Sequence, residues 1–153
     1  MKTIKEISEN RNYTAVNIGK LNNLDVYSII HPKNGQEVRG KVFLKEATKA
    51  TGTEISVQTL PAKTELPYFH THEQNEETYI VLKGFGFFQV DNDCFPVEEG
   101  SVVRIAPLAK RGFCNTSDEP MVLIVIQSRQ NSLEQYSADD GERVKVEPKW
   151  RDN

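Results

Sequence analysis

The sequence predicts an all-β domain, and three observations lead to this prediction. Apolar and polar residues alternate over short segments; in 54–60, for example, Ile55, Val57 and Thr59 alternate with polar neighbours. Clusters of Gly, Pro, Asn and Asp separate these segments at close, regular intervals. Almost no segment shows the 3.6-residue periodicity of an amphipathic helix. Short strands at such regular spacing indicate a sandwich or a barrel.

The first part of the chain leads into this series of strands. Residues 1–12 are polar apart from Ile4 and Ile7, whose spacing permits either a short helix or an extended arm. His31 precedes a proline in a turn and is expected in solvent rather than at a site. A polar connection is expected at 47–53. The strands predicted here are 13–19, 25–30, 40–46 and 54–60.

The turn signals become denser after this point. Two prolines bracket a loop that delivers residues 68–71 to the next strand. The tail from Arg129 stays polar until Val144, Val146 and Trp150, and we expect these three residues to dock back as a final strand. The strands predicted between the loop and the tail are 77–82, 85–90, 94–97, 101–105, 111–115 and 121–128.

Length, composition and charge narrow the function classes. A chain of 153 residues with 37% hydrophobic and 27% charged residues is expected to form one domain around one core. The formal net charge is -3 without a basic block, which argues against nucleic acid as a partner. No apolar run approaches the length that crosses a bilayer, so we expect no membrane partner and a cytoplasmic protein. The two cysteines, Cys94 and Cys114, fit a reduced compartment without a disulfide framework.

A candidate metal site lies in the segment PYFHTHEQNEETYIVLKG. Residues two apart in an extended chain point to the same face, so His70 and His72 are expected to project side by side. A carboxylate on the next strand, from Glu76 or Glu77, completes a compact cluster of two imidazoles and one carboxylate. This donor set suits Fe, Mn, Ni or Zn. The segment therefore predicts a divalent transition-metal site.

These residues resemble the first signature of the cupin superfamily, in which two His separated by one residue are followed by Glu and then Gly. Here His70, His72, Glu77 and Gly84 take these places, and the spacing to the glycine selects Glu77 over Glu76 as the ligand. An earlier glycine of the signature would fall on Thr64 and is absent.

The second cupin signature is recognisable in GSVVRIAPLAKRGFCN but is incomplete. Gly100 and Asn115 match it, and Pro107 keeps the chemistry of a turn although the Pro-x-Gly of the family is lost. The fourth metal ligand of the family, a His, falls on Arg111.

The resemblance implies a double-stranded β-helix, or jelly-roll barrel, of two antiparallel sheets with the site in its interior. It implies a single domain over 1–153, with a core at about 40–128, an N-terminal strand arm at 1–39 and a C-terminal tail at 129–153. It also implies a homodimer through the N-terminal arm. Because cupins include enzymes of many kinds as well as storage and sensing proteins, it identifies no reaction.

Arg111 changes what this site is expected to do. Arginine stays protonated and does not ligate cations, and at about 4 Å from a divalent ion it costs roughly 8 kcal/mol at an effective dielectric near 20. The guanidinium then either swings away from a three-ligand site, pairs with Glu77 in place of the ion, or lies in solvent at the barrel mouth. The planar guanidinium of an arginine beside an apolar cavity also suits a carboxylate or a phosphate, which it binds through two N–H groups. Strand parity places Tyr79 on the same face as Glu77. Arg111 and Tyr79 are therefore the candidate ligand-binding residues.

Two hypotheses remain open. In the first, His70, His72 and Glu77 hold a divalent ion in a small metalloenzyme, and Arg111 orients an anionic substrate. In the second, the barrel is a metal-free binding or sensing module for a small molecule, with Arg111 replacing the fourth ligand. The sequence assigns no catalytic residue and no reaction.

Overall fold

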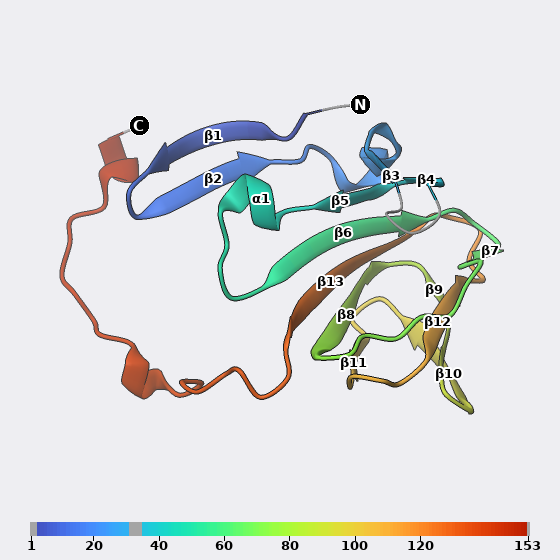
Figure 1. The fold of residues 1–153 in the computed structure, drawn as a ribbon. Helices are drawn as coiled ribbons and strands as arrows, with labels where there is room; N and C mark the ends of the chain where they lie inside the picture. The colour runs from blue at the N-terminus through green and yellow to red at the C-terminus, as the bar shows by residue number, and fades with distance from the viewer. Residues whose placement is uncertain (1–2, 31–34, 153) are drawn as a thin grey trace.

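The computed structural model describes residues 3–30 and 35–152, and it confirms the all-β prediction. Two antiparallel sheets carry the fold (Figure 1). The five-stranded sheet has the order β11 (Val102–Ile105), β8 (Asn75–Lys83), β13 (Met121–Arg129), β6 (Glu54–Leu60) and β5 (Lys41–Phe43). The four-stranded sheet has the order β10 (Asp93–Glu98), β9 (Phe85–Val90), β12 (Arg111–Asn115) and β7 (Thr64–Glu65).

The main core lies between these two sheets. Strand alternation sends every second side chain inward, so Tyr79 and Val81 on β8 are buried together with Phe88 on β9 and Phe113 on β12. The rings of Phe88 and Phe113 stack with centroids 4.8 Å apart. Phe87, one residue away on β9, is 43% exposed, so neighbouring phenylalanines in this strand divide between the two faces.

The N-terminal region covers the other face of the five-stranded sheet. Leu24 and Tyr27 pack against Val42, Val57 and Val122 in a second cluster of buried residues. The sequence left a short helix or an extended arm open for the first twelve residues, and the described part of this segment is extended. There, β1 (Lys5–Asn10) pairs with β2 (Tyr13–Asn17) in a separate two-stranded sheet. A further small sheet joins β3 (Ser28–Ile30) to β4 (Glu37–Arg39).

Two predicted strands lose the most residues to helices. The segment 25–30 begins inside a 3-10 helix, η1 (Leu21–Val26), and only its end forms β3. The strand predicted at 40–46 ends at Phe43, and α1 (Lys45–Thr48) follows. The carboxylate of Glu54 accepts hydrogen bonds from the backbone N–H groups of Leu44 and Lys45, which stabilises the start of this helix. The turn predicted around His31 lies outside the described residues.

The expected final strand in the tail is wrong. After β13 the chain runs away from the barrel as a long irregular segment (Figure 1), with two 3-10 helices, η2 (Ala138–Asp140) and η3 (Lys149–Asp152). Val144, Val146 and Trp150 are each more than 70% exposed, so they bury too little apolar surface to fix a strand. None of the helices in the described residues is long and apolar enough to cross a membrane.

Candidate metal centre

The two histidines lie on an extended loop between β7 and β8, and not on a strand as the sequence suggested. His70 forms one isolated bridge with Arg111, with backbone N···O distances of 3.2 and 3.1 Å. Along the same edge of β12, Glu65 pairs with Cys114. The loop therefore has four residues between its two contacts where β12 has only two, and it must bulge outward. The backbone carbonyl of His72 is fixed by the N–H of Leu108 at 2.8 Å.

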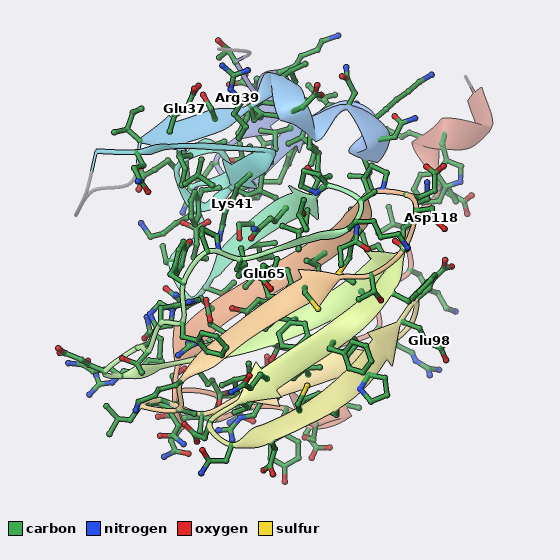
Figure 2. The ribbon with its side chains drawn as sticks, turned by 90° about the vertical axis from the view of Figure 1, so that its right-hand side faces the viewer. Glu37, Arg39, Lys41, Glu65, Glu98 and Asp118 are labelled. Carbon is green, nitrogen blue, oxygen red and sulfur yellow. The ribbon has the colours of Figure 1, made fainter. Side chains whose placement is uncertain are left out.

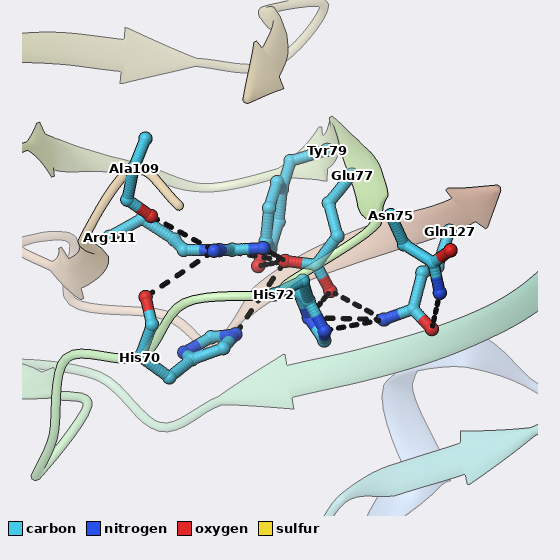
Figure 3. A network of polar contacts seen from close by, with 8 residues as sticks. All are labelled: His70, His72, Asn75, Glu77, Tyr79, Ala109, Arg111 and Gln127. Carbon is cyan, nitrogen blue, oxygen red and sulfur yellow. Dashed lines mark hydrogen bonds and ion pairs between the residues drawn. The ribbon is translucent and has the colours of Figure 1, made fainter. Parts of the chain in front are cut away.

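Glu77 projects from β8 toward these two imidazoles (Figure 3). Its side chain is 6% exposed, and its Oε1 lies 3.1 Å from Nε2 of His72. Its Oε2 lies 3.6 Å from Nε2 of His70. One ligand atom from each of the three residues lies within 4.8 Å of the others. The structure thus brings together the three residues that the sequence singled out as metal ligands.

Arg111 points at Glu77, which is one of the three arrangements that the sequence left open. Nε and one terminal nitrogen of Arg111 donate to Oε2 of Glu77 at 2.9 and 2.8 Å. The other terminal nitrogen donates to the carbonyls of Ala109 at 3.0 Å and His70 at 3.4 Å. The hydroxyl of Tyr79 donates to the same Oε2 at 2.7 Å. The guanidinium is fully buried, and at least four of its five N–H groups donate to Glu77, Ala109 and His70.

Sequence reasoning missed Gln127 and Asn75, which complete the network. The amide nitrogen of Gln127 lies 3.0 Å from Nε2 of His72 and 3.4 Å from Oε1 of Glu77. Its amide oxygen accepts a hydrogen bond from Asn75 at 3.3 Å. A signal was present in the sequence, because Gln127 shares strand parity with buried Val125 and is therefore a polar residue on the inward face.

The surroundings favour an ionised Glu77 and a neutral His72. Burial would raise the pKa of Glu77, but its contacts with His70 and Tyr79 and the charge of Arg111 hold that pKa well below its usual range. Burial, helped by the charge of Arg111, lowers the pKa of His72. Burial and the negative charge of Glu77 raise the pKa of Tyr79, so its hydroxyl stays protonated and donates.

These residues fit a three-ligand metal site. Neutral imidazole and ionised carboxylate are the forms that bind a cation. Two atoms bound to one ion at about 2.1 Å are at most about 4.2 Å apart, so the cluster needs only a small contraction. The hydrogen bond from Gln127 to His72 would have to yield to the ion. A metal-bound His usually donates a hydrogen bond from its other ring nitrogen, which fixes the orientation of the ring. His70 lacks this hydrogen bond, since its Nδ1 is buried without a partner among the described residues.

Comparisons with known proteins agree with this fold. The family model described as "Cupin domain" matches residues 56–127. The crystal structure of a cupin protein from Bacteroides fragilis is 39% identical and superposes with a TM-score of 0.64, covering 69% of this chain and 89% of that one. The chain therefore belongs to the cupin superfamily, and its double-stranded β-helix fold is confirmed.

Two more distant matches give less information about this protein. An uncharacterized protein from Methanocaldococcus jannaschii is 30% identical over 73 residues, which span 48% of this chain and 54% of that protein. A structure described as a predicted oxalate decarboxylase from Thermotoga maritima has a TM-score of 0.55 at 22% identity, covering 67% of this chain and 90% of that one. At this identity the second likeness concerns the fold alone.

Proposed function

We propose that this protein is a small cupin that binds a divalent transition metal through His70, His72 and Glu77 and uses it to bind or transform a small anionic molecule. The observation that supports the proposal best is how the two oxygens of Glu77 are divided. Arg111 and Tyr79 occupy Oε2, and this leaves Oε1 to face the imidazole of His72. A carboxylate held in this way is pre-organised as a single-oxygen ligand.

Each residue of the network has a role in this proposal. His70 and His72 supply nitrogen donors, and Glu77 supplies oxygen; this set suits Zn, Ni, Mn or Fe. A bound ion with open coordination positions supplies Lewis-acid chemistry. Arg111 keeps Glu77 ionised and oriented. No residue is assigned as a general base, so catalysis and simple binding both stay within the proposal.

The charges of the site favour an anionic ligand. Glu77 and Arg111 neutralise each other, and burial keeps His72 neutral. A divalent ion therefore adds two positive charges that no other carboxylate of the cluster offsets. Positive charge in a partly buried site is stabilised by an anion at the open positions.

A second candidate function is binding without a metal. The observation that favours it is the buried ion pair of Arg111 and Glu77. Because the charge of the guanidinium already neutralises the carboxylate, the site needs no cation for charge balance. In that case the small molecule is held by the residues of the barrel interior without an ion.

Metal analysis separates the two candidates. Protein purified without added metal is analysed for Zn, Ni, Mn and Fe, and the metal-free protein is then titrated with Ni by calorimetry. We expect about one ion for each chain, with binding lost in His70→Gln and in His72→Gln. Glu76→Gln is the matched control, because Glu76 lies beside Glu77 but pairs with Arg104 outside the site. Absence of binding by the wild type would leave the metal-free candidate.

A further inference from the structure

The inner face of the five-stranded sheet carries a polar group of residues apart from the metal centre. In the antiparallel register, Lys41 on β5 is opposite Gln58 on β6, and Gln58 is opposite Leu123 on β13. Paired residues share a face, and Leu123 belongs to the core between the sheets. Lys41 and Gln58 therefore face the interior, as does Ser56, two residues before Gln58.

Ser56 and Gln58 are buried without partners from the chain itself. They are 2% and 6% exposed, and no hydrogen bond joins either side chain to another of the described residues. Among those residues, only Nδ1 of His70 is both sealed from solvent and without a hydrogen bond. The polar atoms of Ser56 and Gln58 therefore reach accessible space inside the fold. Buried polar groups are normally satisfied, so this pair points to an external partner.

Lys41 gives the same region a positive charge. Lys41 lies on β5, the edge strand of the five-stranded sheet. Figure 2 labels it together with Glu65, which lies on β7, the edge strand of the four-stranded sheet. Its ammonium lies 5.0 Å from the centroid of the Phe43 ring and forms no ion pair with a described carboxylate. Burial lowers the pKa of Lys41, while the charges of Glu77 and Glu54 raise it, so Lys41 also feels the charge of the metal centre.

We infer that Lys41, Ser56 and Gln58 form an anion-binding subsite that holds the carboxylate or phosphate group of the small molecule. The inference rests on the proposed function, because the other end of that molecule reaches His70, His72 and Glu77. Ser56 and Gln58 donate to the oxygens of the anion, and Lys41 supplies the balancing charge.

The dimensions of the sheet agree with a two-ended ligand. Tyr79 on β8 is opposite Val125 on β13, which is opposite Ser56 on β6. Two strand spacings of about 4.8 Å separate β8 from β6, so the subsite lies roughly 10 Å along the sheet from the strand of Glu77. A molecule with an acidic group at one end and an oxygen donor at the other spans this distance.

An anion titration tests the subsite without using the metal. The ¹⁵N-labelled, metal-free protein is titrated with inorganic phosphate and, separately, with acetate at constant ionic strength, and amide chemical shifts are recorded. We expect saturable shifts at residues 41, 56 and 58, with phosphate favoured if the natural group is a phosphate and acetate if it is a carboxylate. Lys41→Met should weaken binding at least tenfold, and Ser56→Ala should weaken it without loss of fold. The control, Lys45→Met, removes a lysine that pairs with Glu46 outside the barrel.

Each other outcome overturns the inference. Absence of saturable shifts in the wild type excludes the subsite, and equal binding by wild type and Lys41→Met excludes the role of Lys41. An inward charge on an edge strand can also serve to prevent edge pairing. Unchanged anion binding with a changed sedimentation coefficient for Lys41→Met would assign Lys41 that role instead. Nickel affinity is measured on the same variants, so a failure of metal binding is recognised separately from a failure of anion binding.

Discussion

Arg111 and Glu77 form a buried ion pair in which two nitrogens of the guanidinium share one carboxylate oxygen, at 2.9 and 2.8 Å. The position of Arg111 corresponds to the fourth metal ligand of the cupin signature. The pair therefore both orients a metal ligand and places a positive charge beside the site. The first two predictions separate these effects.

Arg111→His should raise the affinity for Ni or Zn at least tenfold, about 1.4 kcal/mol, because it removes the repelling charge and adds an imidazole donor. Calorimetric titration of wild type and variant, at a pH where His is mostly neutral, measures the change. Arg104→His is the control, since Arg104 pairs with Glu76 at the surface. Equal affinities would mean that Arg111 does not influence the site.

Arg111→Met should destabilise the metal-free protein by about 3–5 kcal/mol, because it leaves the carboxylate of Glu77 buried without its counter-charge. Urea unfolding measures the loss, and Arg104→Met should cost less than about 1 kcal/mol. Addition of Ni should recover part of the stability, since the ion then compensates Glu77. A variant as stable as the wild type without metal would show that the pair contributes nothing to folding.

Phe88→Ala should destabilise the protein by about 3–5 kcal/mol, because its ring is wholly buried between Tyr79 and Phe113. Phe87→Ala, on the opposite face of the same strand, should cost about 1 kcal/mol or less. Chemical denaturation of the two variants compares them directly. Similar losses would contradict the assignment of the inner and outer faces of β9.

The homodimer stays a prediction. The β1–β2 hairpin forms its own two-stranded sheet, which leaves strand edges and the exposed Ile7 for a second subunit. Sedimentation velocity at micromolar concentration should show a dimer, and Ile7→Asp should shift it toward the monomer. Leu133→Asp changes another exposed apolar residue, in the tail, and should leave the dimer intact. A monomeric wild type would count decisively against this arm as an interface.

Local pattern predicted the sheets well and the site in part. The strands at 54–60 and 111–115 have the bounds that alternation predicts, because both are held on each side by other strands. The bulge in the loop that carries His70 and His72 could not be predicted, since the path of this loop depends on its pairing with β12 far along the chain. The direction of Arg111 was open for the same reason: a long side chain takes the partner that the tertiary fold brings to it. Tail residues 144–150 alternate like a strand, but no sheet edge of the described residues receives them.

The central claim is that one ion binds between His70, His72 and Glu77 while Arg111 stays paired. Anomalous diffraction from crystals soaked in nickel, with data collected at the nickel absorption edge, tests this directly. The account predicts one strong anomalous peak at about 2.0–2.2 Å from a nitrogen of each imidazole and from Oε1 of Glu77, with the guanidinium still on Oε2. A peak elsewhere, or crystals of soaked protein without any peak at these three residues, would contradict it.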